Sequence, residues 1–220
     1  MGRFLTKIDM AKYTRNEELA NIITHGIGAI LSVIGLILLV VYAAEHGDAY
    51  HITGVSIFGA TLILLYLMST LYHTFQRPEL KRVFRILDHS AIYLLIAGSY
   101  TPFTLVTIHG KWGWTLLVVI WTLAIAGVIF KLFFTGRFHL ASTLIYIGMG
   151  WVAMFAIKPL FEQTPTGGLI LLVLGGVLYT GGTAFYLWDK LPYNHAVWHG
   201  FVMGGSLCHF MAVYYYVLPS

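Results

Sequence analysis

Charged residues are scarce in this sequence: Asp, Glu, Lys and Arg make up 10% of its 220 residues, whereas 58% are hydrophobic. Soluble globular proteins carry about 25% charged and about 45–50% apolar residues. The composition therefore excludes an ordinary water-soluble domain and indicates a membrane protein. The net charge is +4, but the cations are spread thinly between apolar runs. They form no basic recognition element, so we expect no nucleic-acid partner.

Cysteine is limited to Cys208. A single cysteine excludes an intramolecular disulfide, a CxxC redox pair and a zinc ribbon. Glycine, by contrast, is frequent, with 23 residues that include pairs at 175–176, 181–182 and 204–205. None of them lies in a phosphate-binding loop pattern, and such pairs are typical of helices that approach one another closely in lipid.

The sequence contains several long runs of apolar residues. A membrane-spanning helix needs about 20 apolar residues. We predict an all-α integral membrane protein, a seven-transmembrane helix bundle that forms a single domain over residues 20–217. Its spans are expected near 20–44, 51–73, 85–108, 112–131, 139–159, 167–188 and 194–217. Residues 1–19 are expected to form a cytoplasmic amphipathic segment rather than a cleaved signal peptide.

The distribution of cations predicts the orientation of the bundle. Eleven of the 13 Lys and Arg residues precede the first span or lie in the loops after the second, fourth and sixth spans. The loops on the opposite side hold only Lys111 and Lys158. Because cytoplasmic loops are enriched in Lys and Arg, we expect a multi-pass protein of the cell membrane. Its N-terminus would be cytoplasmic and its C-terminus would lie outside.

Ionisable residues within the spans are candidates for function, because each costs at least about 2.5 kcal/mol to bury unless its charge is satisfied. His73 ends the span at 51–73, Asp88 lies near the start of 85–108, and His195 and His199 begin 194–217. The predicted topology brings these residues to one depth near the cytoplasmic face. His195 and His199 share a helix face, so their imidazoles are spaced to bind one metal ion. A third imidazole and a water would complete a tetrahedral zinc site.

Each candidate also has a structural alternative. The histidine pair at 195 and 199 matches an interfacial or hydrogen-bonded pair as well as a ligand pair. Asp88 matches an acid at a helix start that is stabilised by the helix dipole and paired with Arg82 or Arg85. Ser69 matches a serine that packs between helices. Three further histidines lie within spans. His25 is expected to form a structural hydrogen bond, and His209 is expected to pack between helices or to line a pore. His89 points about 100° away from Asp88 around the helix, so we do not expect it to be a ligand.

Four motifs follow one another along the chain. They are EELANIITHGIG with Glu17, Asn21 and His25, STLYHTF with Ser69 and His73, LDHSAIYLLIAGSYTP with Asp88, and HAVWH with His195 and His199. With these motifs, essentially the whole chain resembles the hemolysin III branch of the progestin and adiponectin receptor (PAQR) superfamily. These are seven-helix membrane proteins related to the alkaline ceramidases.

The resemblance implies roles for five of the matched residues. In similar proteins one histidine of the second span and two of the seventh span bind zinc, which implies a Zn²⁺ site at His73, His195 and His199. The aspartate contacts a zinc-bound water and the serine lies beside the site, which implies catalytic roles for Asp88 and Ser69. The long N-terminal region and extended loops of animal hormone receptors are missing, so we expect a bacterial source rather than hormone recognition.

The leading functional hypothesis is a zinc-dependent hydrolase that cleaves a lipid amide or ester, as a ceramidase does. Zinc lowers the pKa of a bound water to about 7 and polarises the acyl carbonyl. Asp88 would hold that water and transfer its proton, while Ser69 would hydrogen-bond the oxyanion. The membrane lipid would be the substrate, with its acyl chain inside the bundle.

Three alternatives remain open. The protein could be a non-enzymatic membrane sensor or regulator in which zinc is structural and the lipid is a ligand. The family name suggests a pore-forming cytolysin, or hemolysin, but a resident seven-span protein has no evident route to another cell's membrane. A proton or ion transporter would need a relay of acidic residues inside the spans, and this sequence has only one, near one membrane surface.

Overall fold

The computed structural model describes residues 13–219, and all regular structure within this range is helical. The helices are α1 (Arg15–His46), α2 (Ala49–Thr74), α3 (Pro78–Pro102), α4 (Lys111–Phe134), α5 (His139–Gly150), α6 (Ile157–Gln163), α7 (Thr166–Tyr186) and α8 (Asn194–Tyr216), with the π-helix η1 (Phe103–Thr107) and the 3-10 helix η2 (Val152–Ala156). Of the segment expected over residues 1–19, residues 1–12 lie outside the described part of the chain.

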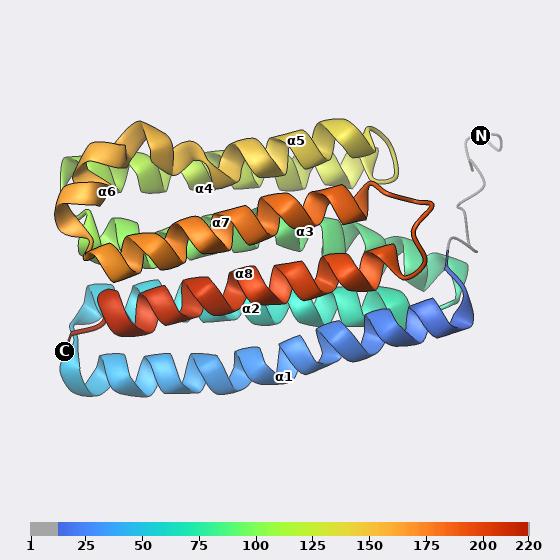
Figure 1. Ribbon diagram of the computed structural model, residues 1–220, viewed down its shortest axis with the longest axis horizontal. Coiled ribbons are helices and arrows are strands. Elements are labelled where there is room, and N and C mark those ends of the chain that lie inside the picture. The colour runs from blue at the N-terminus through green and yellow to red at the C-terminus, as the bar shows by residue number, and fades with distance from the viewer. Residues whose placement is uncertain (1–12, 220) are drawn as a thin grey trace.

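Seven segments of the described chain are long and apolar enough to cross a membrane, which confirms the expected number of spans. They are α1, α2, α3 with η1, α4, α5 through α6, α7 and α8. The helices run up and down as one bundle, with α1 along one edge and α4 and α5 along the other (Figure 1). We refer to the end at which α1, α3, α5 and α8 begin as the N-terminal end of the bundle.

Side-chain caps fix the starts of the first two helices. The hydroxyl of Thr14 accepts a hydrogen bond from the Glu17 backbone N–H at 3.3 Å, and the Glu17 carboxylate accepts the Thr14 backbone N–H at 2.8 Å. This capping box satisfies N–H groups that have no partner within the helix. Asp48 caps α2 in the same way through the backbone N–H groups of Tyr50 and His51. Pro78 occupies the first turn of α3, where a missing N–H costs nothing.

The fifth span is interrupted near its middle, where α5 ends at Gly150 and η2 follows before α6. The hydroxyl of Tyr100 on α3 lies 3.0 Å from the carbonyl oxygen of Met149 and 2.7 Å from that of Gly150. The same hydroxyl accepts the backbone N–H of Ala153 at 3.0 Å. Because a membrane interior supplies no water to unpaired backbone groups, Tyr100 stabilises this break.

The main buried core lies where α1, α2, α3 and α8 meet, and it includes Leu39 and Phe58. Close approach of the helices depends on glycine: a Cβ added at Gly28 of α1 would lie 2.7 Å from the ring of Tyr66 on α2. The outer face of α1 is instead exposed, with Ile30 64% accessible. Such apolar surface is suited to lipid, so the polar residues of the bundle interior stand out as candidates for function.

Candidate metal centre

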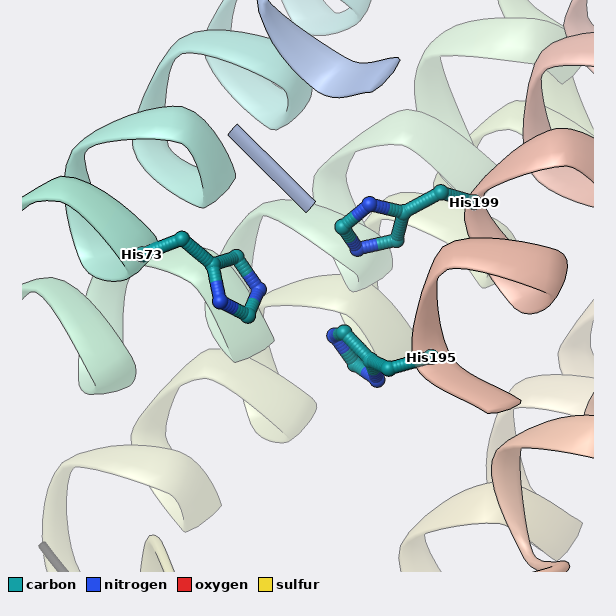
Figure 2. Close-up of side chains that lie close together, drawn as sticks. All are labelled: His73, His195 and His199. Atoms are coloured by element: carbon teal, nitrogen blue, oxygen red, sulfur yellow. The ribbon is translucent and has the colours of Figure 1, made fainter. Parts of the chain in front are cut away.

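Three histidines from two helices meet inside the N-terminal end of the bundle. His73 lies in the last turn of α2, whereas His195 and His199 lie four residues apart at the start of α8. All three are buried, and one ring nitrogen from each lies within 4.8 Å of the other two. Figure 2 shows the ring of His73 facing the two rings from α8. The sequence-predicted ligand set is therefore brought together and could hold a metal ion.

A carboxylate on α1 fixes the orientation of His73. Nδ1 of His73 lies 2.5 Å from Oε2 of Glu18, and the other oxygen of Glu18 accepts a hydrogen bond from the Lys81 ammonium at 2.7 Å. With its Nδ1 proton donated to this carboxylate, the imidazole presents the lone pair of Nε2. That Nε2 atom is buried and has no hydrogen-bond partner within residues 13–219. Metal-binding histidines commonly have such a carboxylate behind them, so His73 fits a metal ligand.

His199 is oriented in a similar way by α1. The hydroxyl of Thr24 donates to the carbonyl oxygen of Ala20 at 2.8 Å, and its oxygen lies 3.0 Å from Nδ1 of His199. Since the hydroxyl proton is directed to the backbone, the hydroxyl oxygen accepts the Nδ1 proton of His199. The remaining nitrogen, Nε2, is then unprotonated and available as a ligand.

His25 belongs to the same cluster, which the sequence did not reveal. Its ring stacks on that of His199 with centroids 3.4 Å apart and planes inclined by 13°, and it meets the edge of Tyr66. The expected structural hydrogen bond is not formed: in the described chain neither ring nitrogen of His25 has a partner. His25 instead packs against the candidate metal centre through its contact with His199.

Asp88 and Ser69 lie on the wall of a cavity that also contacts His195 and His199. Both side chains are buried. One feature of the structural alternative for Asp88 is wrong, because α3 begins at Pro78, about three turns earlier. No Lys or Arg among residues 13–219 comes within 4.0 Å of the carboxylate, and Arg85 interacts with it electrostatically at longer range. The roles of Asp88 and Ser69 in catalysis stay predictions.

The cavity continues from the histidines toward the break in α5, between α3, α5, α7 and α8. Its walls are mainly apolar or aromatic, as at Leu65, Ile92, Leu95, Tyr100 and Trp151. Its far end is lined by His209, whose Nε2 lies 3.4 Å from the carbonyl oxygen of Leu172. The polar centre thus sits at one end of a long apolar chamber.

Tyr13 covers the centre from outside the spans. Its ring lies 5.2 Å from the ring of His195 and 5.9 Å from that of His73. Burial raises the pKa of the Tyr13 phenol above its ordinary value, so the hydroxyl stays neutral at physiological pH. The phenol therefore contributes a neutral polar group beside the histidines.

The motif EELANIITHGIG contains two neighbouring glutamates, and the structure assigns them different roles. The resemblance named Glu17, but its carboxylate caps α1 and accepts the backbone N–H of Tyr193 at 3.0 Å. Glu18 is the residue that contacts His73. Both glutamates stand at helical spacing from Asn21, so local periodicity does not separate them. The sequence alone therefore did not reveal that Glu18 of α1 lies behind the ligand His73.

A seven-helix membrane protein with a buried three-histidine cluster is the class that this architecture defines. The chain belongs to the haemolysin-III related family, whose model matches residues 13–210. It is 57% identical over 204 residues to Hemolysin-3 of Bacillus cereus, covering 93% of each chain. It is 50% identical to the Hemolysin-3 homolog of Bacillus subtilis, covering 93% of this chain and 96% of the relative.

A more distant likeness extends to animals. The Monocyte to macrophage differentiation factor of Homo sapiens is 27% identical over 215 residues, which cover 95% of this chain and 88% of the relative. No solved structure matches the chain. The region matched by the family model, residues 13–210, contains His73, His195 and His199 and reaches into each of the seven apolar segments of the described chain.

Proposed function

We propose that this protein is a zinc-dependent hydrolase of a lipid amide or ester. The observation that carries the proposal is the placement of the buried cluster of His73, His195 and His199 at one end of an apolar chamber whose wall includes Asp88. Three imidazoles suit zinc and leave a coordination position for a reactant. A purely structural zinc site would be closed by a fourth protein ligand.

Each residue has a task in this proposal. A bound zinc ion supplies Lewis-acid polarisation of the acyl carbonyl and an activated water. The three histidines hold the ion, and Glu18 fixes His73 in the tautomer that presents Nε2. The Asp88 carboxylate accepts the proton of the attacking water and returns it to the leaving group. The Ser69 hydroxyl donates a hydrogen bond to the oxygen on which negative charge develops.

The chamber determines the kind of substrate. Its apolar wall along Ile92 and Leu95 is suited to an acyl chain, which would bring the carbonyl group to the histidines at the polar end. An acyl chain along this wall would exclude water, which would make electrostatic interactions at the carbonyl stronger than in solution. The substrate would therefore be a membrane lipid that carries an acyl chain in amide or ester linkage.

The site is proposed to lie near the cytoplasmic face of a bacterial cell membrane. Lys and Arg are concentrated in the connections at the N-terminal end of the bundle, as the positive-inside rule requires for cytoplasmic loops. Two similar proteins come from Bacillus species. The N-terminus would accordingly be cytoplasmic and the C-terminus external.

The names of relatives favour two other candidates. The relatives named Hemolysin-3 suggest a cytolysin, and the human relative is named as a differentiation factor rather than an enzyme. A sensor or regulator would keep zinc as a structural ion and would bind lipid without cleaving it. The same chamber and histidines serve that function, so turnover of lipid is the property that separates the candidates.

The test is single-turnover hydrolysis by the purified protein in lipid nanodiscs, with labelled lipid amides and esters and with metal counted in each sample. We expect cleavage by the wild type, loss of metal and cleavage in His73→Ala, and loss of cleavage with metal retained in Asp88→Asn. His46→Ala, at an exposed histidine of the opposite end, is the matched control and should behave as wild type. Zinc-loaded wild type that cleaves none of these lipids would favour the sensor, and lysis of added red cells would favour the cytolysin.

A further inference from the structure

His209 lies at the far end of the chamber, away from the metal centre. It follows His199 by ten residues on α8, which places it about 15 Å further along the helix axis. The same cavity contacts both histidines. Its wall between these two depths includes the apolar side chains of Ile92, Leu95 and Val202. The chamber therefore has a polar group at each end, with an apolar stretch between them.

The two ring nitrogens of His209 have different surroundings. Nε2 lies 3.4 Å from the carbonyl oxygen of Leu172 on α7, and a carbonyl oxygen can only accept a hydrogen bond. No carboxylate of residues 13–219 lies within 4.0 Å of the ring, so the apolar interior favours a neutral imidazole with its one proton on Nε2. Nδ1 then carries a lone pair, and this atom is buried without a hydrogen-bond partner in the described chain. A buried acceptor that is left unpaired destabilises the protein.

The neighbours of His209 hold its ring in place without donating to Nδ1. The ring packs edge-on against Tyr179, with centroids 5.4 Å apart, and it occupies the space that a Cβ at Gly175 would need. The Tyr179 hydroxyl is instead hydrogen-bonded to that of Ser206 at 2.8 Å. Ser99, on the cavity wall at a similar depth, donates its hydroxyl to the backbone of its own helix. These neighbours leave the donor for Nδ1 to whatever occupies the chamber.

The separation of the two ends fits an acyl chain of defined length. Carbon–carbon bonds of about 1.5 Å that meet at about 111° advance an extended chain by about 1.25 Å per carbon. A chain whose carbonyl carbon lies at the histidines of the metal centre would thus reach the depth of His209, about 15 Å away, at about its twelfth carbon. A hydroxyl group at that carbon would supply the missing donor.

We propose that the chamber selects an acyl chain with a hydroxyl group at about its twelfth carbon, and that this hydroxyl donates a hydrogen bond to Nδ1 of His209. The inference rests on the proposed function, because it requires that the chamber takes an acyl chain, and it names the class of that chain. A site that pairs a hydroxyl of its ligand discriminates against the analogue without one, since the buried acceptor then stays unpaired. His209 is accordingly a specificity-determining residue with no part in bond cleavage.

The experiment measures binding of free fatty acids to the purified protein in detergent, by displacement of a fluorescent fatty acid. The probes are 12-hydroxydodecanoic acid, dodecanoic acid and 2-hydroxydodecanoic acid, which carries its hydroxyl at the other end of the chain. We expect the wild type to bind 12-hydroxydodecanoic acid more tightly than dodecanoic acid. His209→Gln should lower this ratio of affinities by about tenfold, or about 1.4 kcal/mol. The amide of Gln can still donate to Leu172, but a carbon stands where Nδ1 was.

Two further variants serve as controls. His209→Asn keeps an acceptor near the position of Nδ1 and should retain the preference. Ser99→Ala removes a hydroxyl from the same end of the chamber and should also leave the preference unchanged. The affinity for 2-hydroxydodecanoic acid relative to dodecanoic acid should be the same in the wild type and in His209→Gln. Each variant is checked for folding by its melting profile, and the wild-type preference is tested without any substitution.

Three results would overturn the proposal. Wild type that binds dodecanoic acid as tightly as 12-hydroxydodecanoic acid would show that water or another group satisfies Nδ1. An unchanged ratio in folded His209→Gln would show that the hydroxyl binds elsewhere, and failure of all three acids to bind would exclude an acyl chain from the chamber. Lipid cleavage is measured separately: a hydroxyl preference without cleavage would refute the hydrolase and keep this inference, whereas cleavage without the preference would do the reverse.

Discussion

Replacing Glu18 by Gln tests how the metal centre is held in place. Glu18 is 2.5 Å from Nδ1 of His73 and also accepts a hydrogen bond from Lys81. The substitution keeps the size of the side chain but removes its charge. His73 then loses the charged acceptor that fixes its tautomer and raises the basicity of Nε2, because the amide of Gln offers only a neutral oxygen. The proposed zinc site should therefore be weakened while the bundle still forms.

The size of the effect follows from the position of Glu18 behind a ligand rather than in the ligand set. Loss of such a partner commonly costs 10- to 100-fold in metal affinity, or about 1.4–2.7 kcal/mol. The assay is competition for zinc between the purified protein and a chromophoric chelator at fixed pH. His73→Ala, which removes the ligand itself, should lose more affinity than Glu18→Gln does.

Glu17→Gln provides the matched control. Glu17 is the neighbouring acid, and its contacts are to the backbone of Thr14 and Tyr193 rather than to a histidine. Because Gln also serves at this position of a capping box, this variant should change stability little and leave zinc affinity unchanged. Zinc affinity in Glu18→Gln equal to that of the wild type, or an equal loss in Glu17→Gln, would refute the reasoning.

Three further predictions concern stability and pH. Tyr100→Phe removes the hydroxyl that satisfies the break in α5, so we expect a loss of about 1–3 kcal/mol in thermal unfolding in detergent; an unchanged melting temperature would contradict this. Gly205→Ala places a methyl group 2.8 Å from the ring of Tyr179 and should lower the melting temperature. Gly148→Ala is the control, because its added methyl group meets no neighbouring group within 4 Å and should leave the melting temperature unchanged. Equal effects of the two substitutions would show that packing is not the cause. Hydrogen bonds from the backbone and ring of His51 hold the pKa of Asp48 below its ordinary value. This cap therefore stabilises α2 fully at pH values above the pKa of Asp48 in the unfolded chain. The stabilisation is lost as the pH falls through the lower pKa of the folded protein. The acid limb of a stability profile should therefore be shallower in Asp48→Asn, and an identical limb would contradict the prediction.

The helical architecture could be predicted because hydropathy needs no knowledge of neighbouring helices. Each apolar run is longer than a bilayer requires, so seven spans follow from the sequence. The break after Gly150 could not be predicted, because the group that satisfies it, the hydroxyl of Tyr100, belongs to a different helix. Nothing in the residues around 150 identifies that partner.

The three histidines of the candidate site could be predicted, because their depth in the membrane and their spacing along the helices follow from the sequence. The i, i+4 spacing of His195 and His199 and the position of His73 at the end of a span were sufficient to bring the ligands together. The rotation of α1 about its own axis, which decides which of its side chains face the histidines, could not be predicted from the sequence. Only packing of α1 against α2 and α8 shows that Glu18 rather than Glu17 contacts His73, and that His25 stacks on His199.

The central claim is that His73, His195 and His199 hold one zinc ion, and elemental analysis of the detergent-purified protein tests it most directly. Metal per chain is measured for the wild type and for the three single alanine variants, each checked for folding by its melting profile. The account predicts about one zinc per wild-type chain and its loss in all three variants. Folded wild type without zinc, or variants that retain it at the wild-type level, would contradict the account.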